Sequence, residues 1–179
     1  MDKAKAGAAD DAIARFERLF HEHWSRVYGA LFRVVGDPAE AEDLALETFL
    51  RLYLRPPAKG NDSQLAGWLY RVATNLGFNA VRARRRRAFY ELQAGREALE
   101  EKSTSNPAKE SEMGHSRKQV RRVLAQMRPR AARLLILRHS GLSYAEVASA
   151  LGVAPGSVGS LLARAEAEFM RRFRELEGE

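Results

Sequence analysis

The chain has 179 residues, enough for one large domain or two small ones, and it carries a formal net charge of +7. A basic surplus suits a polyanionic partner, which is nucleic acid or an anionic membrane surface. Because the chain has no cysteine, we exclude disulfides and thiolate zinc sites. The polar start argues against a signal peptide, and the longest aliphatic run, Leu134 to Leu137, is too short to span a membrane. We therefore expect a cytoplasmic protein.

The first part of the chain predicts a mobile tail over residues 1–10, followed by an amphipathic helix over residues 11–35. The segment Gly36-Asp37-Pro38 ends this helix and starts the next, because Asp is a good N-cap and Pro fits the first helical position. The apolar stripe of the helix consists of Phe16, Phe20, Trp24, Val27, Leu31 and Val34.

The second predicted helix, from Pro38 to about Leu54, has an acidic side formed by Glu40, Glu42, Asp43 and Glu47. An acidic face cannot bind nucleic acid, so it either meets a basic protein partner or is a solvated face whose first-turn acids favour the helix dipole. The residues alone leave both interpretations open. A metal site is not favoured, since no partner helix carries Glu-x-x-His.

A loop rich in helix breakers, residues 55–63, leads to a third predicted helix that starts near Leu65 and runs into an arginine cluster. Five of the six residues from Arg82 to Arg87 are arginine, and they pass right round a helix. Aromatic, amide and guanidinium groups precede the cluster, and together they can stack on unpaired bases, bond base edges and hold phosphates. We therefore interpret this helix as a nucleic-acid surface rather than a merely solvated one.

The composition then divides the chain into two domains. Residues 93–115 are polar, with Ser, Pro and Gly, and predict a flexible linker. The fold class is therefore all-α, with small helical domains at 11–92 and 116–179.

The second domain contains a predicted helix-turn-helix. Ser143 and Glu146 form a capping box, Gly152 suits a left-handed turn, and Pro155 fits the first turn of a second helix. Such a second helix can lie in a DNA major groove. Among the motifs of catalysis, no phosphate loop, metalloprotease pattern or nucleophile elbow occurs, so we expect neither an enzyme nor a cofactor.

Three stretches in this order resemble the extracytoplasmic-function (ECF) group of bacterial RNA polymerase sigma factors. Residues 39–53, A-E-A-E-D-L-A-L-E-T-F-L-R-L-Y, resemble the core-binding helix of region two. Residues 65–87, L-A-G-W-L-Y-R-V-A-T-N-L-G-F-N-A-V-R-A-R-R-R-R, are similar to its promoter-melting and minus-ten segment. Residues 127–153, M-R-P-R-A-A-R-L-L-I-L-R-H-S-G-L-S-Y-A-E-V-A-S-A-L-G-V, resemble the start of region four.

The resemblance implies a promoter-specificity subunit that binds core RNA polymerase and promoter DNA and that has an anti-sigma factor as a further partner. The implied polymerase-docking residues are Glu40, Asp43, Leu46, Glu47 and Phe49. The implied minus-ten residues are Asn61, Trp68, Arg71, Asn75, Asn79, Arg82, Arg84 and Arg85. The implied minus-thirty-five residues are Ser143, Tyr144, Pro155, Gly156, Ser157, Ser160 and Arg164.

The recognition helix departs from the family pattern. Gly159, Leu161 and Glu166 stand at three positions where the family usually has a basic residue. The loss of these basic side chains predicts weaker DNA binding with a flatter salt dependence. Two alternatives therefore stay open: a sigma-like interaction protein that reads DNA weakly, and a stand-alone helix-turn-helix regulator.

Overall fold

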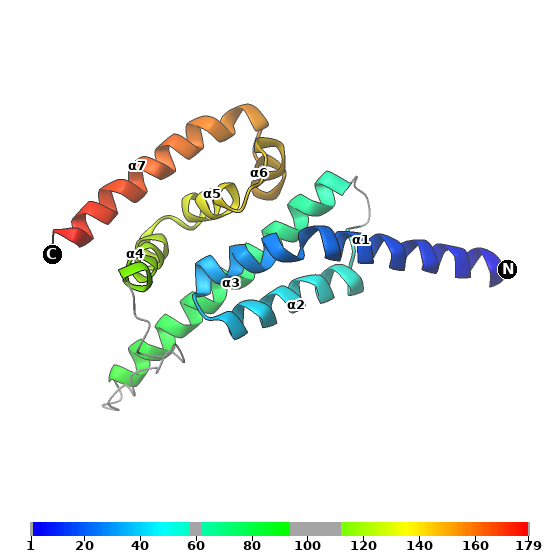
Figure 1. Cartoon of the computed structure of the whole chain (residues 1–179), viewed down its shortest axis with the longest axis horizontal. Coiled ribbons are helices and arrows are strands. Elements are labelled where there is room, and N and C mark those ends of the chain that lie inside the picture. The colour runs from blue at the N-terminus through cyan, green and yellow to red at the C-terminus, as the bar shows by residue number, and fades with distance from the viewer. Residues whose placement is uncertain (1, 58–61, 94–111, 179) are drawn as a thin grey trace.

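The structure is a computed structural model that describes residues 2–57, 62–93 and 112–178, and these residues are helical without strands. The first three helices are α1 (Asp2–Val35), α2 (Pro38–Leu54) and α3 (Asp62–Gln93). The second group comprises α4 (Glu112–Gln126), α5 (Pro129–His139), α6 (Tyr144–Leu151), the 3₁₀ turn η2 (Pro155–Ser157) and α7 (Val158–Glu177). In Figure 1 the second group lies along one side of the first.

Two predicted boundaries differ from the structure. Helix α1 starts at Asp2 instead of Asp11, so residues 2–10, expected to form a tail, continue the helix. Helix α4 starts at Glu112, inside the predicted linker 93–115, and most of that linker lies outside the described residues.

Local sequence signals set the helix ends as expected. The Asp37 carboxylate accepts a hydrogen bond from the Glu40 backbone N–H at 2.8 Å, with Pro38 at the first helical position. The backbone at Gly36 has φ 80°, a left-handed conformation that glycine adopts without steric cost. The chain can therefore reverse between α1 and α2 within two residues.

Helices α1, α2 and α3 pack around a common core that contains Val27, Leu31, Phe49 and Leu69, each almost fully buried. Helices α1 and α3 lie close together at Gly77, where an added Cβ would lie 3.1 Å from the Leu31 Cδ2 atom. These three helices form the first bundle.

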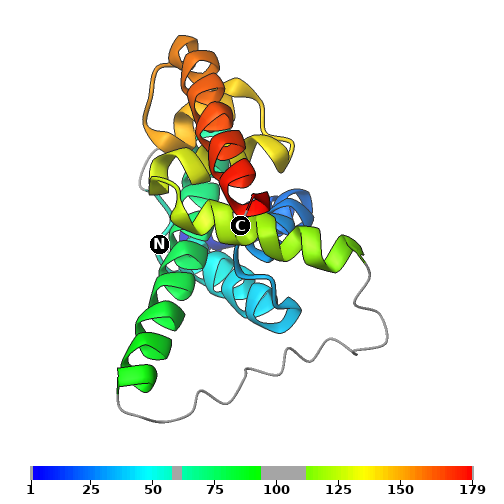
Figure 2. The ribbon, with the colours of Figure 1, turned by 90° about the vertical axis from the view of Figure 1, so that its left-hand side faces the viewer.

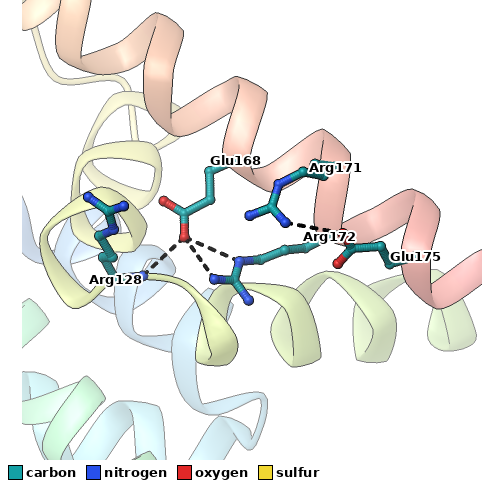
Figure 3. Close-up of polar contacts among 5 residues, drawn as sticks. All are labelled: Arg128, Glu168, Arg171, Arg172 and Glu175. Carbon is teal, nitrogen blue, oxygen red and sulfur yellow. Dashed lines mark hydrogen bonds and ion pairs between the residues drawn. The ribbon is translucent and has the colours of Figure 1, made fainter.

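The second bundle is closed by α7, which packs on α4 and α5. The Glu168 carboxylate of α7 accepts hydrogen bonds from the Arg172 guanidinium at 3.2 Å and from the Arg128 backbone N–H at 3.4 Å, at the turn before α5 (Figure 3). The Arg171–Glu175 pair in the same figure lies on the exposed side of the helix. Glu168 therefore ties the long last helix to the α4–α5 turn.

The two bundles are not separate bodies. Helix α6 lies against the first half of α3, and α4 and α5 lie against α1 (Figures 1 and 2). The buried apolar residues of both bundles form one contiguous cluster. The predicted pair of small helical domains is present, but the two domains are packed together.

Candidate functional site

Helix α2 presents an apolar stripe beside its acids. The side chains of Leu46, Leu50, Tyr53 and Leu54 are 49%, 53%, 57% and 65% exposed, and their spacing places them on one helical face. Asp43 is exposed, and Glu47 pairs with Arg51 at 2.6 Å. Such an apolar stripe with acids beside it is typical of a surface that meets another protein.

Phe49, predicted to dock on the polymerase, does not belong to this surface. It is 2% exposed and packs against the rings of Phe16, Phe20 and Trp24, with the Phe20 ring centre 4.8 Å away. In this structure the helical period turns position 49 toward α1, so its side chain lies outside the exposed face of α2. Phe49 instead holds α2 on α1.

Helix α3 carries most of the predicted minus-ten residues. Asn79 and Arg82 are exposed, while Trp68 and Asn75 are half-buried. Asn61 lies outside the described residues.

Three arginines of α3 already have partners within the chain. The Arg71 guanidinium donates hydrogen bonds to the backbone carbonyls of Ser149 at 2.6 Å and Ala150 at 2.7 Å. Arg84 pairs with Glu40 at 3.0 Å and donates to the Val35 carbonyl, and Arg85 donates to the Ala125 carbonyl at 3.0 Å. Residues predicted for different surfaces, such as Arg84 and Glu40, therefore contact each other.

The helix-turn-helix is built as its sequence predicts. The Ser143 hydroxyl accepts the Glu146 backbone N–H at 3.3 Å, and the Ser143 backbone N–H donates to the Glu146 carboxylate at 2.7 Å. Gly152 ends α6 with φ 64°, in the left-handed region. Pro155 then opens the 3₁₀ turn that leads into α7.

The predicted minus-thirty-five residues are exposed on this motif. The Ser160 hydroxyl donates to the Ser157 carbonyl at 3.1 Å, and the Arg164 guanidinium donates to the Ser160 carbonyl at 3.2 Å. These bonds hold a guanidinium beside two hydroxyls at the start of α7. The residues of this set that are exposed are Ser143, Tyr144, Pro155, Gly156, Ser157, Ser160 and Arg164.

The three unusual positions of the recognition helix differ in their surroundings. Gly159 has room for a side chain, since an added Cβ would lie 3.8 Å from the Tyr144 ring. Leu161 is half-buried against the core, and Glu166 is exposed. Leu161 therefore stabilises the fold and does not form an exposed apolar contact.

A polar cluster lies where α6 meets α1 and α3. The buried His23 ring nitrogen lies 3.2 Å from the Tyr70 hydroxyl, and burial raises the pKa of Tyr70 to about 12 despite the nearby charge of Arg26. Burial alone would raise the pKa of Glu146, but its hydrogen bonds to Ser143 and the charges of Arg26 and His23 hold that pKa below its ordinary value. Glu146 thus serves both the α6 cap and the contact between the bundles.

Like charges also face each other across the bundles. Burial and the nearby charge of Arg82 lower the pKa of Arg133, whose Nε atom is buried without a hydrogen-bond partner and whose guanidinium lies 6.0 Å from the Phe78 ring centre. Burial, followed by the charges of Arg117 and Arg84, lowers the pKa of Arg121. The packed arrangement therefore includes electrostatic repulsion between the bundles.

A groove of about 970 Å³ lies between α1 of the first bundle and α4, α5 and α7 of the second. Its apolar walls include Phe32 of α1, Leu124 of α4 and Phe169 of α7, and Arg33 and Arg121 line it as well. The bundles are thus closely packed at α6 and incompletely packed near α4 and α7.

Within the described residues, no cluster of His, Asp and Glu has the arrangement of a metal site. No single described helix combines the length and apolarity needed to cross a membrane, and α6 and α7 reach that threshold only when joined across a bend of 102°.

Comparison with known proteins matches residues 19–87 to Sigma-70 region 2 and residues 117–169 to Sigma-70, region 4. The ECF RNA polymerase sigma factor SigL of Mycobacterium tuberculosis is 31% identical over 160 residues, which cover 88% of this chain and 88% of SigL. This chain belongs to the ECF sigma factors. It is therefore a transcription initiation factor and not an enzyme.

Other sigma factors agree with this placement. SigE of Mycolicibacterium smegmatis is 31% identical over 156 residues, which cover 86% of this chain but 59% of SigE. The sigma factor RpoE of Bartonella quintana, solved in complex with the anti-sigma factor NepR, has the same fold, with a TM-score of 0.58, 21% identity, and coverage of 88% of this chain and 95% of RpoE. Helices α1–α3 thus contain region two of this sigma factor, and α4–α7 contain region four.

Sequence reasoning missed two exposed groups. The first group is the apolar stripe of α2 beyond Leu46. Leu50 and Leu54 follow Leu46 at helical spacing, so the helical period of the sequence could have predicted that they share its exposed face. Phe89 and Tyr90, 57% and 65% exposed at the end of α3, follow the arginine cluster directly.

Proposed function

We propose that this sigma factor docks on core RNA polymerase through the exposed face of α2, which comprises Asp43, Leu46, Glu47, Leu50 and Leu54. The observation that carries this proposal is the apolar stripe, because leucines at positions 46, 50 and 54 remain about half or more exposed, whereas most leucines that the structure describes are buried or half-buried. Apolar contact supplies affinity, and the adjacent acids supply specificity for a basic partner.

The proposal also assigns one promoter element to each region. The α3 residues Trp68, Asn75, Asn79 and Arg82 contact the opened minus-ten element, where stacking and phosphate contacts offset the few kcal/mol needed to unstack a base. The exposed start of α7 enters the major groove of the minus-thirty-five element.

In vitro transcription from a genomic fragment library tests this function, with purified core polymerase and with or without the protein. We expect defined transcripts only when the protein is added. Substitution of the α2 face by Asp43→Arg with Leu50→Asp should abolish them, whereas Glu17→Arg, an exposed acid on α1, should not. Transcripts that survive the α2 double substitution would refute the docking surface.

The unusual recognition helix supports a second candidate, a sigma-like protein that acts mainly through protein contacts. Glu166 is exposed where the family is usually basic, and Gly159 offers no side chain. This candidate predicts polymerase binding without defined transcripts, so the same experiment distinguishes the two. Because the chain belongs to the ECF sigma factors, the alternative of a stand-alone helix-turn-helix regulator is no longer needed.

We also propose an anti-sigma factor as a partner and the cytoplasm as the location. The support is the RpoE–NepR complex, whose sigma chain shares this fold, together with the polymerase-binding role. Co-purification of an anti-sigma factor that blocks transcription in the assay above would test the partner.

A further inference from the structure

The groove between α1, α4, α5 and α7, which we call the α1–α7 groove, combines apolar walls with basic side chains. It measures about 970 Å³, and each surrounding helix contributes an apolar side chain: Phe32 of α1, Val120 of α4, Ile136 of α5 and Phe169 of α7. Small-molecule sites have volumes of about 300–1,000 Å³ and mostly apolar walls with a few polar groups. The α1–α7 groove therefore has the size and the lining of a small-molecule site.

Gly29 of α1 contributes to the open space of this groove. An added Cβ at Gly29 would meet only the Arg33 Nη1 atom, at 3.1 Å, which is the far end of a flexible side chain. An added Cβ at Gly77, by contrast, would meet the Leu31 side chain in the core at 3.1 Å. Because a glycine inside a helix destabilises that helix relative to alanine, and close packing does not require Gly29, the space that this residue leaves is the feature to explain.

Arg117 and Arg121 line the groove one helical turn apart on α4. No hydrogen bond or ion pair joins either of them to another residue that the structure describes, and like charges at this spacing repel each other. The half-buried Arg121 guanidinium lies against the turn before α2, where an added Cβ at Gly36 would be 2.7 Å from its Cζ atom. Two cations are therefore held beside an apolar cavity without an anion to pair with them.

The charge of the lining and the size of the groove specify the occupant. Among the described residues that line the groove, Glu166 is the only acid, so positive charge is in excess and an anion fits. A docked α-helix, about 10 Å across with its side chains, would fill the volume in roughly 12 Å, or about two turns. So short a helix is only marginally stable, and a small molecule fits the groove better.

We propose that the α1–α7 groove binds a free amphiphilic organic anion, an apolar chain that carries one carboxylate. The chain lies between Phe32 and Phe169, and the carboxylate accepts charge-assisted hydrogen bonds from the Arg117 and Arg121 guanidinium groups. The bound carboxylate also offsets the repulsion between these two cations. The site uses neither the exposed face of α2 nor the residues proposed to contact DNA, so it does not rest on the proposed function.

Isothermal titration calorimetry of the full chain with dodecanoate, kept below the concentration at which it forms micelles, tests the proposal. Dodecyltrimethylammonium is the matched control ligand, because it has the same apolar chain and the opposite charge. We expect dodecanoate to bind at one molecule per chain and to raise the melting temperature, and we expect the cationic ligand to do neither. Equal binding of the two ligands, or no binding of dodecanoate, would overturn the proposal.

The substitution Arg121→Gln tests the role of the charge. It should weaken dodecanoate binding by about 10- to 100-fold, since a hydrogen bond to a charged group contributes about this much. Arg122→Gln is the matched control, because it removes the same charge from the next residue of α4, which is exposed and does not line the groove. Equal weakening by both substitutions would show a general attraction to the basic chain and would overturn the site.

The substitution Gly29→Leu tests the role of the space. The added side chain fills the groove from α1 and should abolish dodecanoate binding, while the melting temperature without ligand should not fall, since leucine favours the helix. Gly114→Leu is the control, because an added Cβ at Gly114 has nothing within 4 Å and this residue does not line the groove. Arg121→Gln leaves the space unfilled, so charge and space are tested separately. Parent-like binding by Gly29→Leu would place the ligand elsewhere and overturn the proposal.

Discussion

The substitution Phe49→Ala should destabilise region two rather than remove a polymerase contact. The Phe49 ring is 2% exposed and packs against three aromatic rings of α1. Removal of a buried phenylalanine side chain costs about 3–5 kcal/mol, which is a large share of the roughly 5–15 kcal/mol that stabilises a typical domain. For a unit of this size the melting temperature should fall by more than about 10 °C.

The matched substitution is Leu46→Ala, three residues earlier on the same helix and 49% exposed. It should change stability by no more than about 0.5 kcal/mol but weaken binding to core polymerase by about 5- to 30-fold, the equivalent of 1–2 kcal/mol. Thermal unfolding by circular dichroism and a polymerase-binding titration measure the two effects separately. If Phe49→Ala melts at the parent temperature and still weakens polymerase binding, the ring contacts polymerase directly and our reasoning fails.

Three further substitutions address region four. Gly152→Ala places a Cβ at φ 64° and should lower the free energy of unfolding by about 1–2 kcal/mol, measured by urea denaturation; an unchanged midpoint would contradict the left-handed turn. Because the pKa of Glu146 is lowered in the folded chain, its stabilisation is present above the ordinary value of 4.5 and is lost as pH falls through the lowered value; Glu146→Gln should remove this component of the acid dependence, and identical pH profiles would contradict it. Gly159→Lys should strengthen binding to a minus-thirty-five duplex and steepen the slope of log affinity against log salt by about 0.9, whereas an unchanged slope would show that position 159 does not approach phosphate.

Local signals were predictable from the sequence and distant ones were not. Ser143, Glu146 and Gly152 act on backbone groups within a few residues, so a cap and a left-handed turn follow directly from residue type and spacing. The prediction of a helix-turn-helix is confirmed for that reason.

Arg71 shows where this reasoning stops. Its partners lie 78 and 79 residues away in the chain, and no periodicity within α3 indicates that α6 will lie above it. Phe49 shows a different limit, since a family motif identifies positions that matter without saying whether the side chain contacts the partner or supports the helix that does. Burial alone separates these two roles.

The unpaired Nε of Arg133, with Arg82 nearby, has a consequence for how this sigma factor responds to its ionic surroundings. Two arginine pairs repel across the packed regions, Arg82 with Arg133 and Arg84 with Arg121. Added salt screens such repulsion and also weakens phosphate contacts with DNA. Salt therefore acts on this chain in two ways, since it favours the packed arrangement of the two regions and weakens their contacts with DNA phosphates.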